Sequence, residues 1–202
     1  MIELLVVMAV IGILASLYLP VMSRAKSKAK QVQCVSNLHQ IGVAFRIFAG
    51  EHDGRYPAAV RERYGGLKES AGIGGAYRHF QAVAGSLDSP RLLLCPTDRL
   101  RHSTNWAALT DENVSYLVGV DAQPNNQFHI LAADRNITNR VGRTKPVMRV
   151  AAEARVEWTP ALHGREGNLL FADGRVEFAD DRVEFADDRK LAAAMRQHRQ
   201  TN

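Results

Sequence analysis

An uninterrupted apolar stretch near the start of the chain, Ile2 to Leu19, limits what this sequence can fold into. It reads IELLVVMAVIGILASLYL, and apart from Glu3 and Ser16 every residue is apolar or glycine. A helix of this length spans roughly 27 Å, close to the hydrocarbon thickness of a bilayer. Because a helix on the surface of a soluble domain carries a polar face, we expect this segment to be surrounded by lipid or by other helices.

The helical pattern continues beyond this stretch and changes character. Pro20 closes the apolar run, and we expect it to kink or loosen the helix. Apolar residues then recur at spacings of three and four, which predicts an amphipathic stripe. The stripe consists of Val32, Val35, Leu38, Ile41, Phe45 and Phe48. Gly50 and the turn residues that follow predict the end of the helix.

A basic segment separates the two parts of this helix. Arg24, Lys26, Lys28 and Lys30 lie directly after the apolar run, in a chain of net charge +5. Long basic side chains beside an apolar helix favour the lipid headgroup region. Nucleic-acid binding is the alternative, but it would be supported by interleaved aromatic residues, which this segment lacks. We therefore expect no nucleic-acid partner.

The first twenty residues resemble the N-terminal helix of type IV pilins and type II secretion pseudopilins. The shared features are an acid near the start of an apolar helix (Glu3), the small residues Gly12 and Ala15, the closing Pro20 and a basic-amphipathic continuation. Two further segments resemble pseudopilin-like proteins of the planctomycete and verrucomicrobial type. They are residues 33–42 (QCVSNLHQIG) and 95–98 (CPTD).

This resemblance implies an α+β, pilin-like fold, in which the long helix packs on a small antiparallel β-sheet domain. Residues 1–50 would form the transmembrane and filament-core helix, and residues 51–202 a globular domain that ends in a short terminal helix. Mature proteins of the family begin with an aromatic and a short polar residue ahead of Leu-Ile-Glu, and their precursors carry a basic leader ending in glycine. We therefore expect this chain to start about two residues inside the mature helix.

The C-terminal third carries a hairpin signal. Two alternating runs flank Asp173-Gly174, which predicts a β-hairpin with a two-residue turn. His163, nine further residues and then Asp173-Gly174 also resemble the C-terminal signature of the planctomycete-type pseudopilins. The heptapeptide 175–181 is repeated at 182–188. Because a seven-residue shift reverses the face of each side chain in a strand, we expect the first copy to pair in the hairpin and the second to form an extension or loop.

Two sets of residues are candidates for a covalent or metal site. The resemblance implies an exported protein, in which the pair Cys34 and Cys95 predicts one disulfide between helix and domain; two buried free thiols are the alternative. Related pseudopilins hold calcium in a C-terminal loop, which makes His163, Asp173 and Asp134 weak metal candidates. Calcium requires several oxygen ligands, so structural roles are favoured for these three and no cofactor is expected.

No motif of a familiar catalytic centre is present. The sequence has no Gly-x-Ser-x-Gly elbow, P-loop, His-Glu-x-x-His or Rossmann glycine pattern, and its seven histidines lack ligand spacing. We therefore predict that the protein is not an enzyme. A membrane-anchored hydrolase and a singly anchored periplasmic binding domain that does not polymerise are the alternatives.

The resemblance implies a structural subunit of a type IV pilin-like filament or a type II secretion pseudopilus. Glu3, Gly12 and Pro20 would be its assembly residues, with Glu3 pairing with the N-terminal amine of a neighbouring subunit. The expected partners are copies of the same chain in a helical homopolymer, the assembly machinery and the prepilin peptidase. The helix would cross the inner membrane once before assembly and belong to an extracellular or periplasmic filament afterwards.

Overall fold

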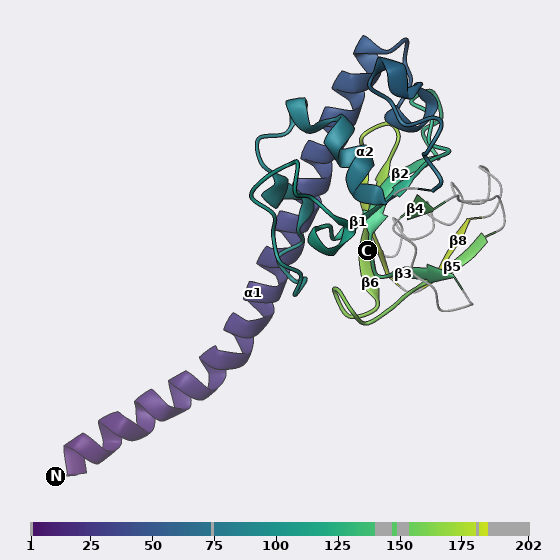
Figure 1. Cartoon of the computed structure of the whole chain (residues 1–202). Coiled ribbons are helices and arrows are strands. Elements are labelled where there is room, and N and C mark those ends of the chain that lie inside the picture. Colours follow the sequence, from purple (N-terminus) through teal and green to yellow (C-terminus); the bar gives the residue numbers. More distant parts are fainter. Residues whose placement is uncertain (1, 74, 140–146, 149–153, 181, 186–202) are drawn as a thin grey trace.

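A single long helix, α1 (Ile2–Glu51), runs through the structure. The computed structural model describes residues 2–73, 75–139, 147–148, 154–180 and 182–185. The first half of α1 projects away from the rest of the chain, and its second half packs along the globular part (Figure 1). The helix continues through Pro20 without a break, so the loss of one hydrogen bond at this proline does not interrupt it.

The two halves of α1 differ in burial. Every described residue from Ile2 to Ala29 is exposed. The second half buries one face, formed by Cys34, Asn37, Leu38, Ile41, Gly42, Ala44, Phe45, Phe48 and Ala49. The predicted stripe is therefore confirmed from Leu38 onward. Val32 is 59% exposed, because where α1 first meets the domain the side of the helix that carries Cys34 is the buried one. At Gly42 an added Cβ would lie 2.9 Å from Leu170 Cδ1, so glycine permits the close approach of α1.

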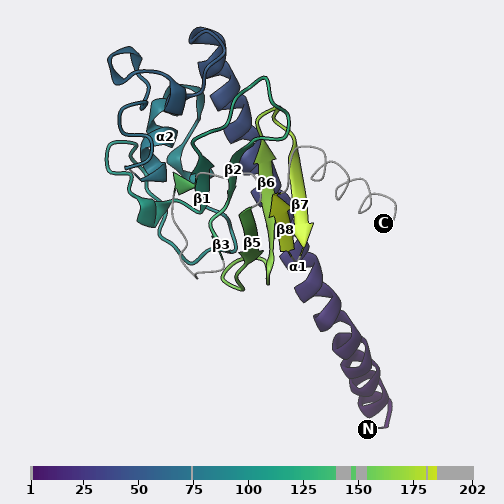
Figure 2. The same cartoon turned by 90° about the vertical axis from the view of Figure 1, so that its right-hand side faces the viewer.

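The helix packs on a small, mainly antiparallel sheet, as predicted. Its strands are β1 (Tyr116–Gly119), β2 (Ile130–Asp134), β4 (Val147–Met148), β6 (Glu166–Phe171) and β7 (Val176–Asp180), in the order β4-β1-β2-β6-β7. Among the strands that the structure describes, only the short β4 runs parallel to its neighbour, β1. Figure 2 shows β6 and β7 beside the second half of α1. This α+β arrangement confirms the predicted fold class.

A second sheet and several short helices complete the described part of the chain. The second sheet is antiparallel, with the order β3-β5-β8, and contains β3 (Ile137–Asn139), β5 (Ala154–Trp158) and β8 (Arg182–Phe185). The helix α2 (Ala76–Ala82) lies beside β1, and the 3-10 helices are η1 (Pro57–Ala59), η2 (Glu62–Tyr64), η3 (Ala84–Ser86), η4 (Pro90–Leu93) and η5 (Asp111–Asn113).

Both faces of the larger sheet are buried. Between α1 and the sheet lies the main core, where the ring of Phe45 makes edge contacts with Tyr56 and Phe80 at centroid distances of 5.9 and 6.1 Å. Neighbouring residues of β6 point to opposite faces. Leu170 belongs to this main core, whereas Leu169 belongs to a second cluster on the opposite face.

The C-terminal hairpin forms, but its turn is longer than predicted. Phe171 N donates to Arg175 O at 2.8 Å and Gly174 N donates to Phe171 O at 2.9 Å, so the loop contains three residues, 172–174. Within this loop only Gly174 has a positive φ, at 87°. A two-residue type I′ turn needs two such residues, so the chain adopts the three-residue loop that ends in a left-handed glycine.

The two copies of the repeated heptapeptide belong to different sheets. The first copy supplies β7, which pairs with β6 as predicted. The second copy contributes β8, which pairs with β5 in the smaller sheet instead of forming a loop or extension. The change of sheet is consistent with the reversal of side-chain direction that a seven-residue shift imposes. The predicted terminal helix lies outside the described residues.

Candidate functional site

Four side chains with ligand or acid–base chemistry meet in the interior beside α1. The sulfur atoms of Cys34 and Cys95 and a ring nitrogen of His163 all lie within 4.8 Å of one another. His163 Nε2 is 3.2 Å from Cys95 Sγ and 3.7 Å from Asp134 Oδ2. Cys34 Sγ donates to Asp134 Oδ1 at 3.5 Å. We call Cys34, Cys95, Asp134 and His163 the buried cluster.

Each member of the buried cluster comes from a different part of the chain. Cys34 lies on α1, Cys95 follows η4, and Asp134 ends β2. His163 lies in the loop between β5 and β6 with φ at +43°, and the next two residues also have positive φ. A left-handed residue other than glycine is uncommon, although histidine is among those that tolerate it. The surrounding packing thus holds the backbone in a conformation that turns the His163 ring toward the two sulfurs.

A second layer of hydrogen bonds surrounds the cluster. The backbone N and the side-chain Nδ2 of Asn168 each donate to Asp134 Oδ2 at 2.8 Å. The hydroxyl of Tyr116 lies 3.2 Å from Cys34 Sγ, and that of Thr97 lies 3.0 Å from Cys95 Sγ. These contacts fix the direction of the carboxylate and supply each sulfur with a hydroxyl partner.

Burial and mutual charge shift the acidities within the cluster. Hydrogen bonds from Cys34, His163 and Thr97 outweigh burial and lower the pKa of Cys95 to about 4. Burial, with the negative charge on Cys95, raises the pKa of Asp134 to about 7. Burial alone would lower the pKa of His163, but the hydrogen bond to Cys95 and the charge on Asp134 raise it. The cluster therefore favours a thiolate on Cys95 beside a protonated imidazole.

The cysteine pair predicted from the sequence is brought together. Both residues are buried at 0% exposure, and both are free thiols in this structure. The predicted disulfide between Cys34 and Cys95 stays a prediction. The sequence did not indicate that His163 and Asp134 would lie against these sulfurs.

Asp173, the third weak metal candidate, lies apart from the buried cluster. The six residues of β6 separate its turn from the His163 loop, and a strand of that length spans roughly 20 Å. The Asp173 carboxylate is 34% exposed and lies 3.5 Å from Arg175 Nε. The structure therefore does not bring Asp173 together with His163 and Asp134, and calcium binding by these residues stays a prediction.

The spacing from His163 to Asp173 nevertheless has a structural explanation. In the loop just before β6, His163 lies 3.2 Å from Cys95 Sγ and within 4.8 Å of the sulfur of Cys34 on α1. At the end of β6, Arg46 of α1 donates through Nη1 to Asp173 O at 2.7 Å, and Tyr56 Oη donates to Ala172 O at 2.6 Å. From residue 34 to residue 46 the helix rises roughly 18 Å, which matches the length of β6. The residues on either side of β6 thus contact α1 or residues close to α1.

The predicted assembly residues lie in the projecting half of α1. Glu3, Gly12 and Pro20 are exposed, and an added Cβ at Gly12 would meet no atom within 4 Å. This helix contains an 18-residue window of mean hydropathy 2.6 that is 0% buried, so it is long and apolar enough to cross a membrane. A single apolar helix of this kind is compatible with a membrane anchor.

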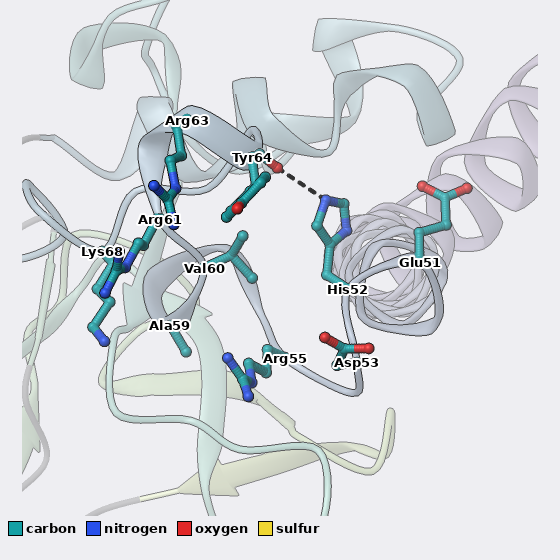
Figure 3. Close-up of a pocket in the computed structure, with 10 residues that line it drawn as sticks. All are labelled: Glu51, His52, Asp53, Arg55, Ala59, Val60, Arg61, Arg63, Tyr64 and Lys68. Atoms are coloured by element: carbon teal, nitrogen blue, oxygen red, sulfur yellow. Dashed lines mark hydrogen bonds between the residues drawn. The ribbon is translucent and has the colours of Figure 1, made fainter.

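A separate, polar pocket of about 700 Å³ lies at the C-terminal end of α1. In Figure 3, Arg61, Arg63 and Lys68 line one side, and Glu51 lies on the other. The ring of His52 lies between them, 2.8 Å from Phe48 O through Nδ1 and 3.0 Å from Tyr64 O through Nε2. Because acidic and basic side chains both line this pocket, we interpret it as a solvent-filled surface depression.

Comparisons of the chain with protein-family models, with curated proteins and with solved structures gave no match.

Proposed function

We propose that this protein is a structural subunit of a type IV pilin-like filament or a type II secretion pseudopilus, and that it polymerises through α1. The observation that carries the proposal is the first half of this helix, which is apolar on all sides, projects from the domain and contains the acidic residue Glu3 (Figure 1). The domain would decorate the outside of the filament.

The projecting half of α1 requires an apolar environment. Between Ile2 and Met22, fifteen large apolar side chains are 46–75% exposed. Removing them from water is favourable by on the order of 20 kcal/mol. Lipid supplies this environment before assembly, and the α1 helices of neighbouring subunits supply it afterwards. The transfer between the two is feasible because apolar helices pack as well against each other as against lipid tails, especially at small residues such as Gly12.

Glu3 favours a polymer over a simple anchor. A carboxylate within an apolar helix is unfavourable in lipid unless it is paired. An anchor gains nothing from it, whereas a filament subunit can pair it with the N-terminal amine of the next subunit. Such a pair would also fix the axial register of the stacked helices.

The test compares membrane insertion with assembly for Glu3→Ala. We expect the variant to remain in the carbonate-resistant membrane fraction, because an apolar side chain favours insertion, while filaments sheared from cells disappear in negative-stain electron microscopy. Glu112→Ala, which removes an exposed acid from the domain, is the matched control and should assemble normally.

Two results would contradict the proposal. Normal filaments from the Glu3→Ala variant would refute the pairing role of Glu3. A wild-type chain that is fully membrane-bound yet forms no filament in cells with an intact assembly system would instead favour a singly anchored periplasmic binding domain.

A further inference from the structure

We propose that Cys34, Cys95, His163 and Asp134 together bind one zinc-class divalent metal ion, which clamps the second half of α1 to the globular domain. This proposal does not depend on polymerisation. It rests on the geometry of the buried cluster and on the hydrogen bonds around it.

The donor atoms have the spacing that a tetrahedral zinc ion needs. With bonds of about 2.3 Å to sulfur and about 2.0–2.2 Å to nitrogen or oxygen, the ligand atoms of such a site lie roughly 3.3–3.8 Å apart. In the buried cluster, Cys95 Sγ to His163 Nε2 is 3.2 Å, Cys34 Sγ to Asp134 Oδ1 is 3.5 Å and His163 Nε2 to Asp134 Oδ2 is 3.7 Å. The two sulfurs and the ring nitrogen stay within 4.8 Å of one another. Small side-chain rotations would therefore close the site around an ion.

The chemistry of the donors also fits this class of ion. Two thiolates, one imidazole and one carboxylate are all common zinc ligands, whereas calcium requires a larger set of oxygens. Both cysteines and Asp134 are at 0% exposure, and the side chain of His163 is 4% exposed. Burying ionisable groups in the interior is costly unless they are paired with one another or coordinate a metal ion, and these four groups lie close enough together to share one ion.

The second layer of hydrogen bonds suits metal-bound ligands. Metal sites orient their ligands through outer partners. With both sulfurs as thiolates, the Tyr116 hydroxyl can donate to Cys34 and the Thr97 hydroxyl to Cys95. Asn168 donates twice to Asp134 Oδ2, which leaves Oδ1 available toward the cluster.

A disulfide would use the same sulfurs differently. It would join Cys34 to Cys95 and remove both thiolates, leaving His163 and Asp134 as a buried pair 3.7 Å apart. Metal binding and the disulfide exclude each other, because both use the same two sulfur atoms. Formation of the disulfide is therefore one of the outcomes that the following test distinguishes.

The test uses full-length protein in detergent, kept reduced and anaerobic, stripped with a chelator and titrated with Co²⁺. We expect one cobalt per chain, with intense sulfur-to-cobalt charge-transfer absorption and the visible bands of tetrahedral cobalt, displaced by one equivalent of Zn²⁺. Cys34→Ser and Cys95→Ser should each weaken the charge-transfer band and lower the affinity by at least about 100-fold. His163→Gln should lower it by about 10–100-fold.

Controls separate ligand loss from misfolding. His102→Gln removes an exposed histidine from the domain and should bind cobalt like the wild type. Tryptophan fluorescence checks that each variant is folded, and the wild-type titration requires no variant at all. The proposal is overturned if folded, reduced wild-type protein shows no sulfur-to-cobalt band. It is equally overturned if protein from its own compartment contains no zinc and has a mass two hydrogens lower, which would identify a Cys34–Cys95 disulfide.

Discussion

The same substitution at two positions of α1 should change the stability of the domain by very different amounts, because the two halves of this helix have different environments. Leu38 is 0% exposed in the core of the domain, whereas Leu14 is 61% exposed on the projecting half. Truncating a buried leucine to alanine removes its transfer free energy and leaves a cavity, which costs about 3–5 kcal/mol. Leu38→Ala should therefore lower the free energy of unfolding of the domain by that amount, while Leu14→Ala should change it by less than about 0.5 kcal/mol.

The assay is thermal unfolding of both full-length variants in the same mild detergent, followed by tryptophan fluorescence. Trp158 is 5% exposed in the second core cluster and reports on the domain. For a domain of this size each kcal/mol corresponds to about 2–4 °C, so Leu38→Ala should lower the Tm by roughly 6–20 °C and Leu14→Ala by less than about 2 °C. Equal Tm shifts for the two variants, or a larger shift for Leu14→Ala, would refute the conclusion that the second half of α1 packs in the core while the first half lies outside it.

Two further contacts give stability predictions. The side chain of Asp98 is 2% exposed and accepts from Arg135 Nε at 2.6 Å and from its Nη2 at 2.7 Å, while the side chain of Arg135 is 35% exposed. Asp98→Asn should therefore lower the free energy of unfolding by about 1–3 kcal/mol near pH 7, measured by urea denaturation. Burial alone would raise the pKa of Asp98, but the hydrogen bonds from Arg135 lower this pKa overall. The stabilisation by the Asp98 carboxylate is therefore present above the pKa of about 4 in the unfolded chain and is lost as the pH falls below that value. The difference in unfolding free energy between the wild type and Asp98→Asn should become smaller at low pH. A difference that stays constant from pH 7 to pH 3 would contradict this assignment. Tyr56→Phe leaves the buried carbonyl of Ala172 without its hydrogen bond and should lower the free energy of unfolding by about 1–2 kcal/mol in the same assay. The control Tyr64→Phe changes a side chain that is 60% exposed and should leave this free energy almost unchanged. Equal losses of stability in the two variants would exclude a role for the Tyr56 hydrogen bond.

Local patterns predicted much of the fold. The spacing from Leu38 to Phe48 indicated the buried face of α1, because packing requires side chains on one side of a helix. The helix was expected to end near Gly50, and it ends at Glu51. The alternating runs around Asp173-Gly174 predicted the hairpin, since turn residues and strand periodicity act over short distances.

Features that depend on distant contacts could not be predicted in the same way. The second heptapeptide forms β8 because β5 offers it an edge, and nothing in the heptapeptide itself specifies that partner. The buried cluster combines residues from α1, the segment after η4, β2 and the His163 loop, so no local spacing reveals it. The weak candidates His163 and Asp134 do meet, but with two cysteines in place of Asp173.

The most direct test of the central claim asks what lies next to the exposed face of α1 in the cell. A photo-crosslinking amino acid in place of Leu14 should join each chain to its neighbours and give a ladder at multiples of 22.3 kDa that disappears when Glu3→Ala is added. The same group in place of Arg63, exposed at the opposite end of α1, is the control and should give no comparable ladder. Crosslinks to lipid alone, with the protein band remaining at the monomer mass, would contradict the account.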